Sequence, residues 1–286
     1  MTYNEKMLTN FIKTFYDGDI MVDEKYGISI PAKNLYIKEF TFTEKLYDKR
    51  NLLKEYKTEL QKAGKRIIEI FEDEMDLKTE IVYSRIRGIL GYNDRIYARK
   101  CMVREIPFKV AKTFLEINHI QGSCVSKYNY GLEYNGEIVA IMTFGKSRFK
   151  KDEIELLRYA SKLGTNVIGG GSRLLKHFIR QSTGNFKLVS YADARWSEGG
   201  LYNALGFTEE EMASPTYSYI DLKYMIIEEE TPIRETRIKY QRHKLEKVFG
   251  RKFDEALSEG DIMRMMGYAR VFDAGNYKFA MDITKD

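Results

Sequence analysis

A loop of three consecutive glycines that opens a helix constrains this chain more than any other feature. The glycines are Gly169, Gly170 and Gly171, and the residues after them, 172–179, read as a helix. Glycine lets the backbone approach a ligand closely, and the free N–H groups of a helix N-terminus point back at such a loop. The loop therefore predicts either a phosphate site at the helix terminus or a turn kept for tight packing.

The composition indicates a globular protein with room for two domains. The chain has 286 residues, of which 43% are hydrophobic and 13% aromatic, enough for packed cores. No apolar run approaches the roughly 18–20 residues that span a bilayer, and the first residues lack the apolar centre of a signal peptide. We expect a soluble, cytoplasmic protein that does not bind membranes.

Cysteine and histidine are too few for an ordinary structural zinc site. The chain has two cysteines, Cys101 and Cys124, three histidines and no C-x-x-C motif. We expect both thiols to be reduced. The net charge of +5 comes from 47 basic and 42 acidic residues, so the surface is mixed rather than uniformly basic.

The pattern of apolar residues divides the chain into three segments, 1–100, 101–225 and 226–286. In the first, strands are expected at 26–31, 34–40 and 66–71, with a helix that ends at Gly64 and another at 76–90. This order predicts a small α/β unit. We find no internal repeat.

The second segment has the clearest pattern, and the overall class it predicts is α/β (α+β) with a mixed sheet. Expected in order are a hairpin at 128–144 around Asn135-Gly136, a strand at 153–160, the glycine loop and helix, a strand at 187–191, a helix at 199–205 and a strand at 217–222. The last segment predicts a basic helix over 233–252, a short helix and a terminal hairpin at 268–279.

The order of elements over 101–225 resembles the GNAT acyltransferase fold. In that family a loop of the form Arg/Gln-x-x-Gly-x-Gly/Ala cradles the acyl-CoA pyrophosphate. Here Asn166-x-x-Gly169-x-Gly171 matches, with Asn166 in place of the usual Arg or Gln. The resemblance implies that Gly169, Gly170, Gly171 and Ser172 bind a cofactor, acetyl-CoA.

The run Leu-Tyr-x-x-Leu-Gly-Phe at 201–207 also matches the GNAT family. The resemblance implies that Tyr202 is the acid that protonates the leaving thiolate. A base is also required, and Glu153, Glu155 and Asp193 are the candidates. Asp193 lies in a run with Arg195 and Trp196, which reads either as the lining of a cleft or as a surface ion pair beside a core tryptophan.

A second resemblance covers nearly the whole chain. The acids Glu72-Asp73-Glu74 after a buried strand, together with the residues at 80–86 and 96–101, look like bacteriophage homing-endonuclease-like proteins. In those proteins a nuclease domain of PD-(D/E)XK type, similar to the very-short-patch-repair endonucleases, precedes a GNAT-like domain and a basic tail. The resemblance implies a phage protein in the host cytoplasm that binds DNA and uses Mg²⁺ for cleavage.

The nuclease motif departs from that family at two acids. The expected Asp position is Gly27 and the expected Glu position is Lys38. Glu39 is the nearest remaining candidate, although strand alternation turns it to the opposite face, and Asp19, Asp23 and Glu24 precede it. The replacements favour a nuclease-like fold kept for binding or structure, and they leave the metal ligands unassigned.

The basic residues of the last segment predict contact with nucleic acid. They are Arg234, Arg237, Lys239, Arg242, Lys244 and Lys247. On a helix with one apolar face such charges reach phosphates, although a solvated charged face has the same pattern.

Three functions therefore stay open. The first is a DNA-binding protein of the homing-endonuclease-like type, the second an N-acyltransferase that uses acetyl-CoA, and the third a phage factor that binds a host enzyme. The sequence does not determine the oligomeric state.

Overall fold

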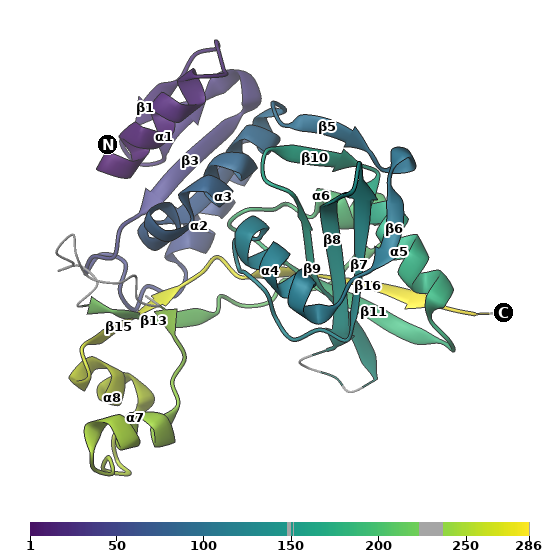
Figure 1. Cartoon of the computed structure of the whole chain (residues 1–286). Helices are drawn as coiled ribbons and strands as arrows, with labels where there is room; N and C mark the ends of the chain where they lie inside the picture. The colour runs from purple at the N-terminus through teal and green to yellow at the C-terminus, as the bar shows by residue number, and fades with distance from the viewer. Residues whose placement is uncertain (148–149, 151, 223–236, 286) are drawn as a thin grey trace.

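The chain folds into an α/β protein, which confirms the predicted class. The computed structural model describes residues 1–147, 150, 152–222 and 237–285, and it contains four sheets in these ranges. Figure 1 shows a small N-terminal sheet and a larger central sheet side by side, with two short helices hanging below them. None of the helices in the described ranges has the length and apolar content needed to cross a membrane.

The N-terminal sheet has four strands in the order β1-β2-β3-β4, antiparallel except for the parallel pair β3 and β4. The elements of this unit are α1 (Tyr3–Lys13), β1 (Met21–Asp23), β2 (Gly27–Ile30), β3 (Leu35–Phe40), α2 (Leu52–Lys62), β4 (Arg66–Phe71) and α3 (Glu72–Leu90). The strands predicted at 26–31, 34–40 and 66–71 are confirmed, and α3 begins four residues earlier than predicted.

Helix α1 was not predicted. Thr2 caps it by accepting a hydrogen bond from the Glu5 N–H at 3.0 Å, and the Glu5 carboxylate accepts one from the Thr2 N–H at 3.1 Å. This reciprocal arrangement is a capping box. The helix buries Leu8 and Ile12 against the sheet, so one face is apolar enough to hold it in place.

The central sheet has seven strands in the order β12-β16-β11-β9-β8-β7-β6. Their bounds are β6 (Met102–Glu105), β7 (Tyr128–Tyr134), β8 (Glu137–Lys146), β9 (Glu153–Ser161), β11 (Phe186–Asp193), β12 (Thr208–Glu209) and β16 (Asn276–Ile283). The predicted Asn135-Gly136 hairpin is β7 and β8. The order of elements predicted from this hairpin to residue 207 is confirmed.

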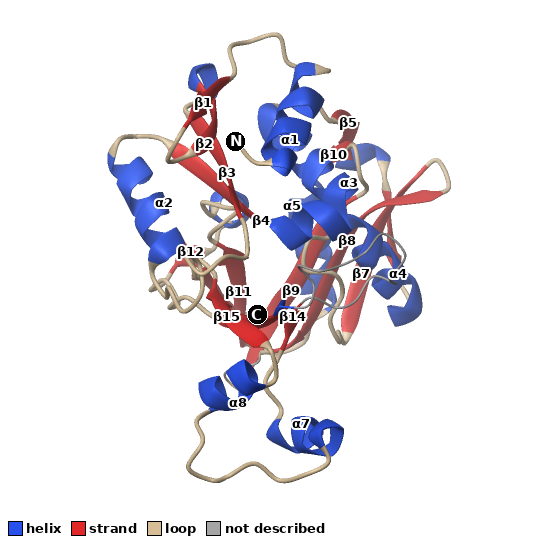
Figure 2. Ribbon diagram, turned by 90° about the vertical axis from the view of Figure 1, so that its left-hand side faces the viewer, coloured by secondary structure: helices blue, strands red, loops and turns tan. Residues whose placement is uncertain are grey.

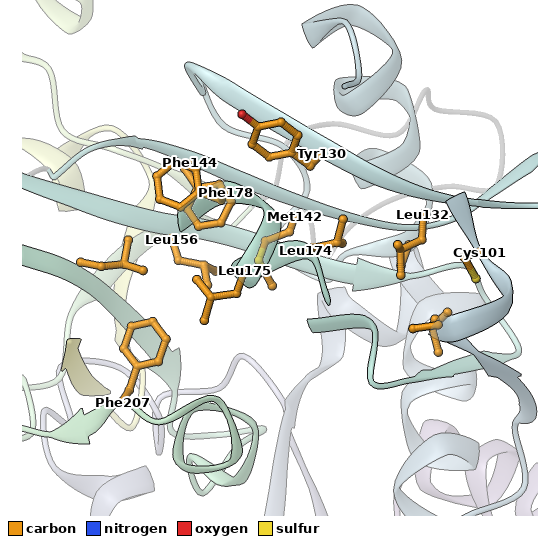
Figure 3. Packing of buried hydrophobic residues seen from close by; sticks show 14 of the residues in the cluster. Cys101, Tyr130, Leu132, Met142, Phe144, Leu156, Leu174, Leu175, Phe178 and Phe207 are labelled. Atoms are coloured by element: carbon orange, nitrogen blue, oxygen red, sulfur yellow. The ribbon is translucent and has the colours of Figure 1, made fainter. Parts of the chain in front are cut away.

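Helices cover both faces of the central sheet (Figure 2). Helix α4 (Phe108–Asn118) lies on one face, while α5 (Gly170–Gln181) and α6 (Gly200–Leu205) lie on the other. Figure 3 shows the core beneath α5, where the rings of Phe178 and Phe144 stack with their centroids 3.7 Å apart. A parallel two-stranded sheet, β5 (Asp94–Tyr97) and β10 (Thr165–Ile168), precedes the glycine loop.

Residues 210–275 form a segment inserted between β12 and β16. Its described elements are β13 (Tyr217–Asp221), β14 (Arg237–Ile238), α7 (Arg242–Phe249), α8 (Glu259–Met265) and β15 (Tyr268–Phe272). The three strands form their own sheet, in the order β14-β13-β15. The strand predicted at 217–222 exists, but it does not belong to the central sheet.

Two predictions for the last segment are wrong. Residues 268–279 do not form a hairpin, because β15 pairs with β13 while β16 inserts between β11 and β12. Gly275, at φ +87°, separates the two strands. The basic helix is also shorter than predicted: α7 starts at Arg242, and Arg237 lies in a strand, where pairing with β13 replaces helical bonds. The division at residue 225 stays a prediction, although the central sheet draws β16 from beyond it.

Replacing Phe279 by alanine tests the position of β16. Phe279 is fully buried and its ring stacks on Tyr202 with centroids 4.7 Å apart. We expect Phe279→Ala to lower the free energy of unfolding by about 3–5 kcal/mol in urea denaturation. The control Phe249→Ala, at a ring that is 37% exposed on α7, should cost about 1 kcal/mol or less. Equal effects of the two substitutions would contradict an interior strand.

Candidate functional site

The central sheet opens between two parallel strands. Strands β9 and β11 pair only from Glu153 opposite Lys187 to Leu156 opposite Ser190. Beyond that point β9 stays paired with β8, and β11 stays paired with β16. The β8–β9 register shifts where Leu157 has no partner, and a bulge of this kind bends a strand. We call the place where β9 and β11 separate the fork.

Tyr202 lies at the fork. Its hydroxyl is 3.1 Å from Ser190 Oγ, and Ser190 in turn donates to the carbonyl oxygen of Leu156 at 2.8 Å. Burial raises the pKa of Tyr202 above its usual value, so the phenol keeps its proton at neutral pH. The residue predicted as a proton donor is therefore a protonated phenol at the point where the sheet opens.

The glycine loop leads directly into α5. Gly169 caps the helix at φ +75°, in the left-handed region that favours glycine, and Gly170 is its first residue. The Gly171 N–H donates to the hydroxyl of Tyr159 on β9. A Cβ atom at position 170 would lie 2.7 Å from that hydroxyl, so glycine is required there for close packing. The Gly171 N–H is thus already bonded inside the protein. The other two N–H groups of the first turn, those of Gly170 and Ser172, are left to bind a ligand.

A basic hollow of about 490 Å³ lies on the outer side of this loop. It is lined by the backbone at Gly169 and Ser172 and by four basic side chains, those of Arg99, Arg173, Lys176 and Arg180. Arg173 donates to the carbonyl of Ala98 at 2.9 Å. None of the four makes an ion pair with an acid in the described ranges. The hollow is therefore suited to an anion.

Asp193 lies in a buried ion pair rather than a surface one. Arg195 donates to Asp193 at 2.8 Å and to both carboxylate oxygens of Glu74 at 2.8 and 2.9 Å. Asp193 and Glu74 together outweigh the effect of burial and hold the pKa of Arg195 well above its usual value. Trp196 is buried, which agrees with the interpretation of this run as an ion pair beside a core tryptophan. The other candidate bases are also buried, and Glu153 lies 3.6 Å from Lys150 Nζ.

Arg237 joins the same cluster from the inserted segment. It donates to the two oxygens of Asp73 at 2.6 and 2.7 Å, and its guanidinium packs over Phe71 with the carbon 4.6 Å from the ring centroid. The Arg195 guanidinium lies 4.7 Å from the same ring. Arg237, which was predicted to contact nucleic acid, is thus held by a carboxylate at the start of α3.

The other predicted nucleic-acid residues differ in their surroundings. Arg242 pairs with Glu246 at 3.1 Å and donates to the carbonyl of Phe253. Lys239, Lys244 and Lys247 are exposed. Arg234 lies outside the described residues. Binding of DNA or of a host protein through this segment stays a prediction.

The acids considered for a nuclease site do not converge. Glu39 accepts hydrogen bonds from Thr2 and Asn4 beside α1. Glu69 is fully buried on the other face of the sheet, where burial raises its pKa well above the usual value. No group of three or more potential ligands among His, Cys, Asp and Glu lies together in the described ranges.

Gly27 and Lys38 have a structural explanation. Gly27 has φ +77°, and a Cβ atom there would lie 2.5 Å from the carbonyl oxygen of Ile37 and 2.8 Å from Glu5 Oε1. Glu5 uses this space, and its carboxylate lies 4.0 Å from Lys38 Nζ. A side chain at position 27 therefore does not fit this backbone.

Comparisons with known proteins find similar solved structures but no matching family model and no matching curated protein. The ribosomal-protein-S18-alanine N-acetyltransferase from Escherichia coli is 14% identical, at a TM-score of 0.35, with 65% of this chain and 96% of that chain covered. A Bacillus subtilis acetyltransferase in complex with CoA is 10% identical, at a TM-score of 0.34, with 64% and 99% covered.

A putative acetyltransferase from Salmonella typhimurium with acetyl-CoA is 12% identical, at a TM-score of 0.36, with 65% of this chain and 96% of that chain covered. These scores are low, so the likeness to these structures carries no argument about function. None of the comparisons supports an endonuclease or a DNA-binding protein.

Several residues around this site were not predicted, among them Arg99, Tyr159 and Lys176. Their side chains meet the glycine loop from β9, from α5 and from the residues after β5. The spacing of Lys176 four residues after Ser172 places both on one side of α5, which is a signal the sequence contains. Nothing local in the sequence marks Arg99 or Tyr159.

The ion pairs of Arg195 should be a large determinant of stability. We expect Arg195→Met to lower the free energy of unfolding by about 3–5 kcal/mol, because it leaves Asp193 without its counter-charge and Glu74 with only Arg237, at 3.6 Å. Arg104→Met, which removes a half-exposed pair with Glu133 at 3.0 Å, is the matched control and should cost no more than about 1 kcal/mol. Chemical denaturation of both variants measures the difference, and similar small losses would show that the buried cluster contributes little.

Proposed function

We propose that this protein is a GNAT-type N-acyltransferase that uses acetyl-CoA. The observation that carries the proposal is the fork, where two parallel strands separate beside a half-buried, protonated tyrosine, Tyr202. The same central sheet carries a glycine-led helix whose first turn borders a basic hollow. An opening in the sheet, a proton donor and an anion site thus occur together.

The residues around the loop fit the phosphates of acetyl-CoA. First-turn N–H groups at Gly170 and Ser172 and the positive end of the α5 dipole favour an anion. Arg99, Arg173, Lys176 and Arg180 add positive charge that no acid in the described ranges neutralises. Because the Gly171 N–H is bonded to Tyr159, we expect the four basic side chains to contribute more to phosphate binding than the backbone does.

Tyr202 supports the chemistry at the fork. Acetyl-CoA, when bound, supplies a thioester whose acyl group an amine attacks. The Tyr202 phenol holds a proton that a leaving thiolate requires, and the contact with Ser190 Oγ at 3.1 Å keeps its oxygen at the fork. Asp193 is engaged with Arg195, so we assign it to positioning the segment after β11 rather than to proton abstraction.

A charge introduced at Ser172 tests the cofactor site. We expect Ser172→Asp to weaken acetyl-CoA binding at least about tenfold in calorimetric titration, because its carboxylate repels phosphate. An acid in the first turn of a helix is compatible with the helix dipole, so the fold should be retained. Ser172→Asn, which has the same shape without the charge, is the control and should bind within about threefold of the natural protein. Absence of acetyl-CoA binding by the natural protein would overturn the proposal.

Removal of the Tyr202 hydroxyl tests the proton donor. Tyr202→Phe keeps the ring on Phe279, so we expect unchanged acetyl-CoA affinity and a fall in kcat of about 10²–10⁴-fold. Thiol release from acetyl-CoA with a panel of amines provides the assay. The control is Tyr134→Phe on β7, which is separated from the fork by β8, and it should retain full activity. Equal kcat for the two variants would remove Tyr202 from the mechanism.

A further inference from the structure

A second cavity lies between the N-terminal unit and the far end of β9. Its volume is about 330 Å³, at the lower end of the range of about 300–1,000 Å³ that small-molecule sites occupy. Helix α3 forms one wall and the end of α4 another, and the rest is lined by Asn93, by residues between 159 and 166, and by Trp196 and Ser197. We call it the junction cavity. It adjoins the part of β9 that has separated from β11.

Two hydrogen-bond donors in this cavity lack partners. Trp196 is 2% exposed and its indole N–H bonds to nothing in the described ranges. Arg85, on α3, stacks its guanidinium over the same indole at 4.6 Å, and its Nε also has no partner. No acid lies within ion-pair distance of Arg85 in the part of the chain that the structure describes. Arg85 is half-buried, and Asp193 and Glu74, whose charges act on it, are already paired with Arg195. A cation in this position favours an anion as its direct partner.

His119 adds a third donor at the end of α4. Its Nδ1 accepts a hydrogen bond from the Gln121 N–H at 3.1 Å, which places the proton of a neutral imidazole on Nε2. Burial, together with the charges of Arg158 and Arg85, holds the pKa of His119 well below its usual value. The ring is therefore neutral at pH 7. Its Nε2–H can donate a hydrogen bond without placing a second positive charge beside Arg85.

One acceptor in the same cavity is also unpaired. Asn93 donates through Nδ2 to the carbonyl of Ser84 at 3.1 Å, which fixes its amide and leaves Oδ1 buried with no partner among the described residues. An amine or ammonium group is the natural donor for this oxygen. The cavity thus presents a charged donor group on one side and an acceptor on another.

We propose that the junction cavity binds the acceptor substrate, a small amine that carries a carboxylate. Arg85 and the Trp196 indole N–H bind the carboxylate, and Asn93 binds the nitrogen end. The choice of an amine rests on the proposed acyl transfer, whereas the anion site rests on the cavity alone. The carboxylate shares its charge and acceptor geometry with a phosphate, and the probes below distinguish the two.

The position of the cavity relative to the fork supports this assignment. The positive charges of Arg158 and Arg85 reach the Tyr202 hydroxyl and oppose the larger effect of burial on its pKa. Tyr159 and Ala160, which line the cavity, lie three and four residues beyond Leu156 on β9, and Leu156 is opposite Ser190, the residue that contacts the Tyr202 hydroxyl. Helix α3 comes from the N-terminal unit, so that unit forms part of the acceptor site rather than a separate function.

Trp196 is the sole tryptophan of the chain, so its fluorescence reports on this cavity directly. The probes are glycine, β-alanine and 4-aminobutyrate, their amides, and 2-aminoethylphosphonate, each titrated without acetyl-CoA. We expect at least one carboxylate to bind about tenfold or more tightly than its own amide and than the phosphonate. No response to any carboxylate, equal binding of the amides, or tighter binding of the phosphonate would overturn the proposal.

Substitution of Arg85 assigns the effect to a residue. Arg85→Met should reduce carboxylate binding to the level of the amide, while Arg87→Met, on the same helix outside the cavity, should not change it. Circular dichroism checks that both variants fold. If one does not, the titrations of the natural protein with the probe series still test the proposal. Because acetyl-CoA is absent, these titrations succeed or fail independently of cofactor binding. Retention of full carboxylate affinity in Arg85→Met would contradict the assignment.

Discussion

The buried ion pairs of Arg195 join the parts of this protein that are distant in sequence. Arg195, just after β11, binds Glu74 in the first turn of α3, while Arg237 of the inserted segment binds Asp73 in the same turn. Burying these charges has a desolvation cost that their mutual attraction offsets only in one geometry, so the cluster fixes how the three parts meet. Farther along α3, Arg85 packs on Trp196, the residue next to Arg195. Helix α3 thus contacts residues 195–196 at two points, through Glu74 and through Arg85. The junction cavity lies beside the contact of Arg85 with Trp196.

The fork and the glycine loop depend on this arrangement in different ways. The fork follows from the central sheet itself, because the bulge at Leu157 bends β9 away from β11. Tyr159, two residues farther along β9, then reaches the glycine loop and bonds Gly171. The basic hollow, the fork and the junction cavity are therefore linked through one strand, β9. A change in β9 is expected to affect all three.

Local patterns in the sequence were sufficient for much of the fold. The Asn135-Gly136 hairpin, the strand β4 and the loop before α5 were predicted because turn residues and apolar spacing act over a few positions. Helix α1 was missed although Thr2 and Glu5 form a capping box, a signal present in the sequence. The place of β16 was not predictable, because its partners β11 and β12 lie more than sixty residues away. Arg237 shows the same limit: its charge suggested phosphate, but only the fold brings Asp73 to it.

A crystal structure of the protein with acetyl-CoA tests most directly whether the glycine loop and the fork form one acyl-CoA site. We predict that the pyrophosphate lies in the basic hollow against Ser172 and Lys176, with the thioester in the fork near the Tyr202 hydroxyl. Acetyl-CoA bound elsewhere, or a hollow and fork without ligand at saturating concentration, would contradict it.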